Sequence, residues 1–150
     1  MTTSATALVD QAKNWADLYG NYTTGEEGAS LTVPLRARAA WEAGDADAFA
    51  ELFADEGSML VSDDQLQGRD AIRTYMAAQF AGDLAGTVLV EEPTEIKTVS
   101  PGVTVAITTG GVTRPGVELT EAEKVRASYV LVLRDGVWQL LSHQTSPIQS

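Results

Sequence analysis

The chain has 150 residues, of which 44% are hydrophobic and 21% are charged, values typical of one globular domain. It contains no cysteine, which excludes disulfides, thiolate zinc sites and cysteine nucleophiles. The net charge is −11, and eight carboxylates with no basic residue among them lie between Arg38 and Arg69. Such a negative field disfavours nucleic acids and anionic membranes as partners.

Residues 1–30 are predicted to form an N-terminal arm that precedes a domain at residues 31–150. Within the arm, apolar side chains recur at spacings of three and four, which predicts a short amphipathic helix with the following stripe: Leu8, Ala12, Trp15, Tyr19 and Tyr22. The arm lacks a basic start and an uninterrupted apolar run, so it does not resemble a signal peptide. No other segment is apolar enough to span a membrane, and we expect a cytoplasmic protein.

Three helices are predicted before the strand-rich half of the chain. The first begins near residues 30–32 and ends at Gly44, since glycine readily adopts the left-handed conformation past a helix. Asp45 is the expected N-cap of the second helix, which runs until Gly57. The third lies within residues 68–82, and its helical spacing places these side chains on one inner face: Ile72, Tyr75, Met76, Gln79 and Phe80.

Segments rich in Val, Ile and Thr predict strands at residues 58–62, 87–92, 94–99, 103–109, 126–134 and 137–145. Asp135-Gly136 is typical of a two-residue type I′ hairpin turn between the last two strands. Residues 114–124, which contain Pro115-Gly116 and several acids, are predicted to form a long mobile loop. Helices followed by an antiparallel sheet indicate the α+β class.

The hairpin turn predicts which side chains of the last two strands face the core. Counting outward from the turn pairs Leu131 with Leu140, Tyr129 with Ser142, and Ser128 with His143. Opposed residues share a face and faces alternate, so the following residues are expected to point inward: Leu133, Trp138, Leu131, Leu140, Tyr129, Ser142, Ala127 and Gln144. His143 is then expected on the outer face, in an apolar patch suited to a homodimer interface.

Several segments resemble proteins of the NTF2-like superfamily, which includes SnoaL-type cyclases and ketosteroid isomerases. They are Trp41–Phe49, Leu52–Gly57, Gly68–Arg73 and Tyr129–Trp138, and the resemblance covers residues 33–146. It implies a cone-shaped roll in which about three core helices pack on a curved, mainly antiparallel sheet around a pocket for a small organic ligand. The segments Phe80–Gly82 and Thr109–Val112 and the Pro-Gly loop are most similar to the SgcJ/EcaC family of enediyne and related natural-product clusters.

The resemblance does not carry steroid-isomerase chemistry to this chain. Val61 stands where the isomerases have their carboxylate base, and Ala37 stands near the position of their helix-one tyrosine. The weak catalytic candidates are Tyr129, Gln144 and His143, because a phenol or an imidazole can orient or protonate a carbonyl, while an amide can orient one by hydrogen bonding but cannot titrate. A single histidine without clustered partners predicts no metal site, and no cofactor motif is present.

The residues predicted to contact the ligand combine aromatic, thioether and polar side chains: Met59, Tyr75, Met76, Phe80, Tyr129, Trp138, Ser142 and Gln144. The expected function is a binding protein for a polyketide or polyene intermediate, or a cofactor-free cyclase or isomerase acting on one. The alternatives are a non-catalytic accessory protein that assists a polyketide synthase, and a dimerisation scaffold with a filled core. The few ionisable residues expected on the inner face favour binding over acid–base catalysis.

Overall fold

The computed structural model of the chain describes residues 25–61 and 63–148. The predicted arm helix at Leu8–Tyr22 lies outside the described residues. The helices are α2 (Gly25–Ser30), α3 (Thr32–Ala43), α4 (Ala46–Glu51), α5 (Arg69–Phe80) and a 3₁₀ turn, η2 (Glu121–Glu123). The strands are β1 (Phe53–Val61), β2 (Asp64–Gln67), β3 (Val88–Ser100), β4 (Val103–Thr113), β5 (Val125–Arg134) and β6 (Val137–Pro147).

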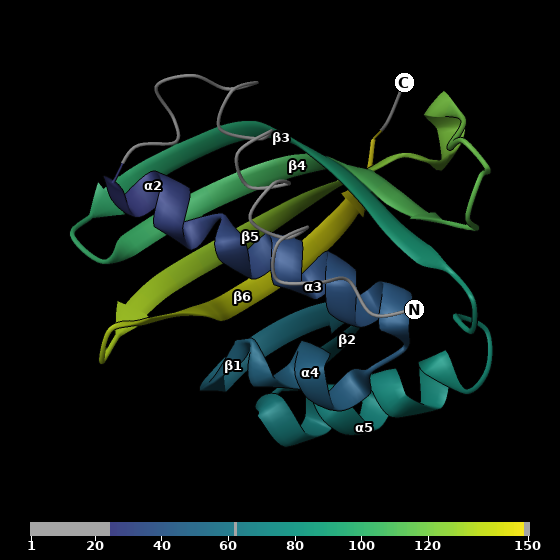
Figure 1. The fold of residues 1–150 in the computed structure, drawn as a ribbon, viewed down its shortest axis with the longest axis horizontal. Coiled ribbons are helices and arrows are strands. Elements are labelled where there is room, and N and C mark those ends of the chain that lie inside the picture. The colour runs from purple at the N-terminus through teal and green to yellow at the C-terminus, as the bar shows by residue number, and fades with distance from the viewer. Residues whose placement is uncertain (1–24, 62, 149–150) are drawn as a thin grey trace.

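The strands form one curved sheet in the order β2-β1-β6-β5-β4-β3. All neighbouring strands pair antiparallel except β1 and β6, which are parallel. Helices α2 and α3 lie across the concave side of the sheet, and α4 and α5 lie together beside β1 and β2 (Figure 1). The α+β class and the roll-like architecture expected from the sequence are therefore confirmed.

The predicted ends of the first and third helices agree with the structure. Gly44 follows α3 with a φ of 65°, and Asp45 accepts a hydrogen bond from the Ala48 amide at 3.0 Å, as an N-cap does. The predicted extent of the second helix is wrong, because α4 ends at Glu51 and Phe53 already begins β1. The Leu140 amide donates to the Leu52 carbonyl at 2.7 Å, so β6 draws this segment into the sheet.

Two further differences concern the strands. The short strand β2 was not expected, and the two segments predicted at residues 87–99 form the single strand β3, which has a bulge between Pro93 and Glu95. Within the loop at 114–124, Glu123 and Thr120 form a reciprocal capping box at the start of η2.

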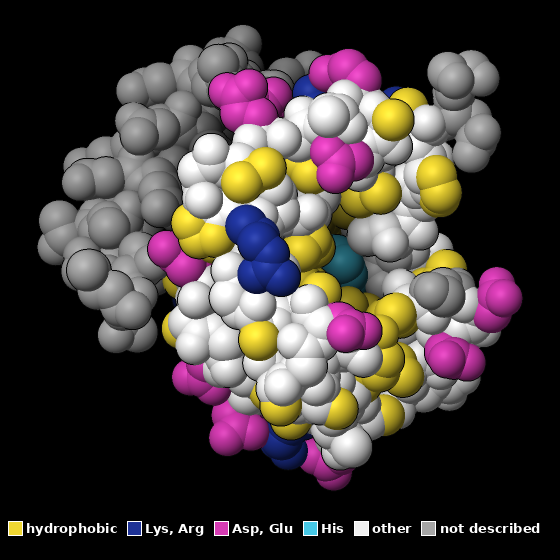
Figure 2. All heavy atoms as spheres, turned by 90° about the vertical axis from the view of Figure 1, so that its right-hand side faces the viewer, with side chains coloured by type: hydrophobic (Ala, Val, Ile, Leu, Met, Phe, Trp, Pro, Cys, Tyr) yellow, Lys and Arg dark blue, Asp and Glu magenta, His cyan; other side chains and the backbone are white. Residues whose placement is uncertain are grey.

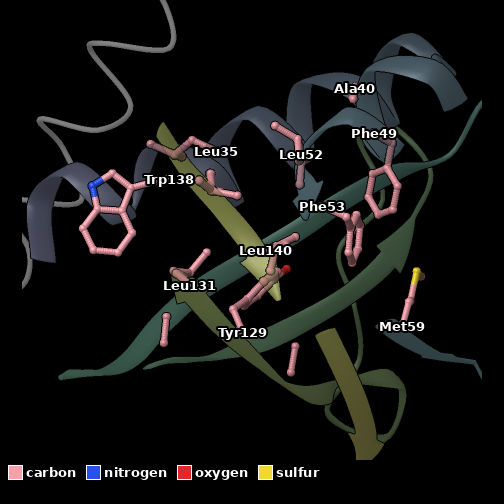
Figure 3. Packing of buried hydrophobic residues seen from close by; sticks show 14 of the residues in the cluster. Leu35, Ala40, Phe49, Leu52, Phe53, Met59, Tyr129, Leu131, Trp138 and Leu140 are labelled. Carbon is pink, nitrogen blue, oxygen red and sulfur yellow. The ribbon is translucent and has the colours of Figure 1, made fainter. Parts of the chain in front are cut away.

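The hydrophobic core lies between the helices and the concave face of the sheet. Figure 3 shows Leu35 of α3 and Phe49 of α4 directed toward the strand residues Tyr129, Leu131 and Leu140. All five side chains are buried, and each is expected to contribute about 1.5–3 kcal/mol through the removal of apolar surface from water. Burial of these side chains holds helices α3 and α4 on the sheet.

The hairpin register predicted from the Asp135-Gly136 turn holds for its first part. Both turn residues have positive φ, and the pairing runs as predicted from Arg134–Val137 to Leu131–Leu140. A bulge follows, because Leu141 has no partner and Val130 pairs with Ser142.

This one extra residue exchanges the two faces of β6 beyond Leu140. Tyr129 is opposite His143, and His143 is therefore on the inner face, buried to an exposed fraction of 8%. Ser142 and Gln144 pair with Val130 and Ser128 on the outer face. The predicted outward position of His143 and the predicted inward positions of Ser142 and Gln144 are wrong for this reason.

Candidate functional site

A cavity of about 420 Å³ lies between the concave face of the sheet and helices α3, α4 and α5. Figure 2 shows its opening as a hollow bordered by hydrophobic side chains, with the histidine visible at its floor. Most of its wall is apolar, and the larger apolar and aromatic residues that line it are Trp41, Phe49, Met59, Tyr75, Met76, Leu84, Leu89 and Leu140. A concave, mostly apolar space of this size is typical of small-molecule sites.

A hydrogen-bonded carboxylate forms part of the cavity wall. The Tyr129 hydroxyl donates to Glu91, 2.5 Å from Oε1 and 2.6 Å from Oε2, and the Thr108 hydroxyl donates to Oε2 at 2.6 Å. Glu91 is 5% exposed and the other two residues are almost fully buried. Hydrogen bonds of this kind to an ionised acceptor are short and strong, so the group is fixed in position.

The sheet register brings this group together from three strands. Glu91 of β3 is opposite Gly110 of β4, while Thr108 of β4 is opposite Ala127 of β5, two residues before Tyr129. A Cβ atom on Gly110 would lie 1.8 Å from the Val90 carbonyl oxygen, so only glycine allows the two backbones to approach as they do here. Gly110 thereby permits the strand pairing that places Glu91 next to Tyr129.

Burial raises the pKa of the Glu91 carboxyl above its ordinary value, and the hydrogen bonds from Thr108 and Tyr129 oppose this shift without cancelling it. The positive charge of Arg38 opposes it more weakly. Burial, followed by the charge of Glu91, raises the pKa of the Tyr129 phenol well above 10. Tyr129 therefore keeps its proton and acts as a hydrogen-bond donor, while Glu91 is poised to exchange a proton nearer neutral pH than an exposed carboxyl.

His143 of β6 lies beside this group, with its ring centroid 4.6 Å from that of Tyr129. Burial lowers its pKa from 6.5 to about 4, so the imidazole is neutral at physiological pH. Its Nδ1 atom is buried and has no hydrogen-bond partner among residues 25–61 and 63–148. A neutral imidazole can donate from one ring nitrogen and accept at the other. The cluster in the cavity wall therefore combines an acid, Glu91, with a neutral base, His143.

A second polar contact fixes the indole of Trp41 in the cavity wall. Its Nε1 donates to the Thr87 hydroxyl at 2.9 Å, and that hydroxyl donates to the Leu84 carbonyl oxygen at 2.7 Å. The indole also makes edge contacts with Phe49 and Phe80 at centroid distances of 5.8 and 5.4 Å. These contacts restrain the Trp41 indole, which forms part of the cavity wall.

The structure brings together half of the residues predicted to contact a ligand. Four of them line the cavity: Met59, Tyr75, Met76 and Tyr129. Phe80 and Trp138 pack in or against the core without lining the cavity, and Ser142 and Gln144 lie on the outer face. Ala37 and Val61, the two positions predicted to correspond to the isomerase groups, are both in the cavity wall.

Glu91 was missed by the sequence analysis. The alternation of side chains along β3 could have identified it. Leu89, Glu91 and Pro93 fall on one face of the strand, and the residues on either side of Glu91 on that face, Leu89 and Pro93, are apolar. An acid at an inward position of a strand indicates a buried carboxylate, but only the register of β3 against β4 and β5 identifies its partners. Its neighbour Glu92 is exposed on the opposite face.

Among residues 25–61 and 63–148, no group of three or more His, Cys, Asp and Glu side chains is arranged to hold a metal ion. No helix in the described part of the chain is both long and apolar enough to cross a membrane.

A sequence model of the SnoaL-like domain matches residues 31–150. The chain belongs to the SnoaL-like family. The matched region contains every residue of the cavity wall, including Glu91, Tyr129 and His143. No curated protein sequence matches the chain.

Solved structures share the fold of this SnoaL-like chain at low sequence identity. A domain of unknown function with a cystatin-like fold from Nostoc punctiforme has a TM-score of 0.76 and 22% identity, covering 85% of this chain and 80% of that one. An NTF2-like protein with a cystatin-like fold from Novosphingobium aromaticivorans has a TM-score of 0.69 and 17% identity, covering 100% and 94%. A putative calcium/calmodulin-dependent protein kinase type II association domain from Thiobacillus denitrificans has a TM-score of 0.67 and 21% identity, covering 79% and 94%. These similarities establish the NTF2-like, cystatin-like fold.

Proposed function

We propose that this SnoaL-like protein binds a small, mostly apolar organic molecule, of the polyketide or polyene type, in the cavity beneath its helices. The observation that carries the proposal is the cavity of about 420 Å³ with an apolar wall and one converging polar cluster, Glu91, Tyr129 and His143. The apolar wall supplies most of the binding energy, and the cluster orients the ligand. The SgcJ/EcaC resemblance supports an enediyne-type biosynthetic setting, and the cytoplasmic location remains a prediction.

The same cluster supports a second candidate, a cofactor-free cyclase or isomerase. An acid with a raised pKa beside a neutral imidazole is the pairing that general acid–base catalysis uses. In such a reaction the neutral imidazole of His143 would donate a hydrogen bond to a substrate carbonyl, and Glu91, held by the Tyr129 hydroxyl, would exchange the proton of a neighbouring carbon. The cavity argues against a dimerisation scaffold with a filled core, whereas a non-catalytic accessory protein that shelters an intermediate would use the same wall without the proton transfer.

The binding proposal predicts saturable uptake of a neutral apolar probe. Nile red should bind the protein at one site, and native mass spectrometry of protein from its producing strain should show a retained organic ligand. Ala127→Leu adds volume to the cavity wall and should weaken probe binding at least about tenfold, whereas Ala78→Leu, on the exposed side of α5, should leave it unchanged.

Absence of both a retained ligand and saturable probe binding would refute this function. If a retained ligand is found, its turnover separates the two classes: Glu91→Gln should abolish conversion in an enzyme while binding persists. A chain that binds without converting is the accessory protein.

We also propose a homodimer formed through the outer face of the sheet. Half-buried aliphatic residues from adjacent strands lie there, with Gln139 and Ser142 among them: Val105, Ile107, Val130 and Leu141. An apolar centre with polar neighbours is typical of such interfaces. Sedimentation velocity should show a dimer that Ile107→Asp dissociates, and a wild-type chain that stays monomeric at all concentrations would contradict the proposal.

A further inference from the structure

The charges at the cavity are of one sign. Glu91 is in its wall and Glu123 lies at its border, and no Lys or Arg is among the described residues that line it. Glu91 makes no ion pair within the described part of the chain: its hydrogen-bond partners there are the hydroxyls of Tyr129 and Thr108, and Arg38 acts on it only weakly through its charge. A carboxylate buried without a cation lacks the partner that buried charges ordinarily have.

The basic side chains on neighbouring elements are directed to other groups. The Arg38 Nε donates to the Leu89 carbonyl at 3.2 Å, and Arg114 donates to the Ala85 carbonyl at 3.3 Å. Lys124 forms an ion pair with Glu121 at 2.7 Å. Figure 2 shows a basic side chain beside the hollow and acidic side chains around its opening, so the field at the entrance is mixed and the interior is negative.

We propose that the polar end of the bound molecule is a protonated amine, which pairs with the Glu91 carboxylate. This inference rests on the proposed function, since it assumes that an apolar molecule occupies the cavity, and it adds the chemical class of the polar group. The ammonium replaces the missing cation next to Glu91, whose two carboxylate oxygens retain acceptor capacity beyond the hydroxyl hydrogen bonds.

Two other features of the wall suit a lipophilic cation. The aromatic residues Trp41, Phe49 and Tyr75 line the cavity, and the face of an aromatic ring attracts a cation that has left water. The neutral His143 can accept a hydrogen bond from an ammonium and adds no positive charge that would repel it. The net charge of −11 also raises the local concentration of cations and lowers that of anions. A carboxylic acid of the same shape would instead meet Glu91 with a like charge.

The test is a series of three probes that share one skeleton and differ only in the polar group: 2-naphthylmethylamine, 2-naphthylmethanol and 2-naphthylacetic acid. Isothermal titration calorimetry at pH 7 and low salt should give the amine at least about tenfold tighter binding than the alcohol, and the acid the weakest. Glu91→Gln should reduce the amine's affinity to about that of the alcohol and change the alcohol's affinity much less. The matched control is Glu92→Gln, which removes the same charge. Glu92 is the next residue of β3 and is exposed on the other face of the sheet.

Binding of the alcohol as tightly as the amine to the wild-type protein would overturn the amine proposal while leaving the binding function intact. Equal effects of Glu91→Gln and Glu92→Gln would overturn it as well, since the preference would then reflect net charge and not pairing in the cavity. If neither Nile red nor any of the three probes binds, the proposed function itself fails. The comparison of amine and alcohol affinities on the wild-type protein tests the amine proposal even if Glu91→Gln folds poorly.

Discussion

His143→Leu is expected to remove much of the protein's loss of stability in acid. Burial lowers the pKa of His143 from 6.5 to about 4. Between these pH values the unfolded chain binds a proton at His143 and the folded protein does not. This shift corresponds to about 3 kcal/mol of stability that is fully present above pH 6.5 and is lost as the pH falls to about 4. The variant lacks the imidazole and should not show this loss.

The measurement is the free energy of unfolding from urea titrations between pH 7 and 4. At pH 7 the variant should lie within about 1 kcal/mol of the wild type, because the loss of the ring contact with Tyr129 is offset by removal of the unpartnered Nδ1. His143 is the only histidine in the chain, so its proton signal in an NMR titration reports the pKa directly. A histidine that titrates near pH 6.5 would contradict the buried position on the inner face.

Glu91 provides a control, because its effect on the pH dependence of stability has the opposite sign to that of His143. Its pKa is raised, so the folded chain takes up this proton at a higher pH than the unfolded chain does. Its protonation therefore stabilises the fold as the pH falls through the folded pKa toward 4.5. Glu91→Gln removes this gain, so the two variants should change the pH dependence in opposite directions. If both variants changed the pH dependence of the unfolding free energy in the same direction, these two groups would not be its cause.

Gly110→Ala is expected to cost about 3 kcal/mol of stability or more and to disturb the site. The added methyl group would lie 1.8 Å from the Val90 carbonyl oxygen and 2.8 Å from the Glu91 Cα, where backbone and not a flexible side chain must move. Relief requires the separation of β3 from β4 next to Glu91, which would also draw the Glu91 carboxylate away from Tyr129. Nile red binding should therefore weaken along with stability.

The matched control is Gly82→Ala, which adds the same methyl group just after α5. Its nearest contact is the Ala78 carbonyl at 3.4 Å, and its φ is not in the left-handed region, so stability should change by no more than about 0.5 kcal/mol. Urea unfolding of both variants and the wild type provides the comparison. Equal stability of Gly110→Ala and Gly82→Ala would show that the strands can separate at no cost.

Short sequence motifs correctly predicted those helix ends and turns that depend only on residues close together in the chain. Gly44 and Asp45 mark the boundary between α3 and α4 because a left-handed glycine and a capping carboxylate act within one turn of chain. The Asp135-Gly136 turn predicted the hairpin for the same reason, since both residues must adopt positive φ. The helix predicted to continue through Phe53 was wrong, because the helical spacing there is outweighed by pairing with a strand more than 80 residues later.

The sequence by itself determined the α+β class, most helix and strand segments, and part of the cavity wall, Met59, Tyr75, Met76 and Tyr129. Only the tertiary structure decided the polar cluster. A bulge at Leu141 turns His143 inward and Gln144 outward, and the pairing of three strands brings Glu91 to Tyr129. The physical reason is that side-chain direction in a strand alternates with every residue, so one unpaired residue reverses it, and pairing across a sheet depends on distant segments that no local pattern encodes.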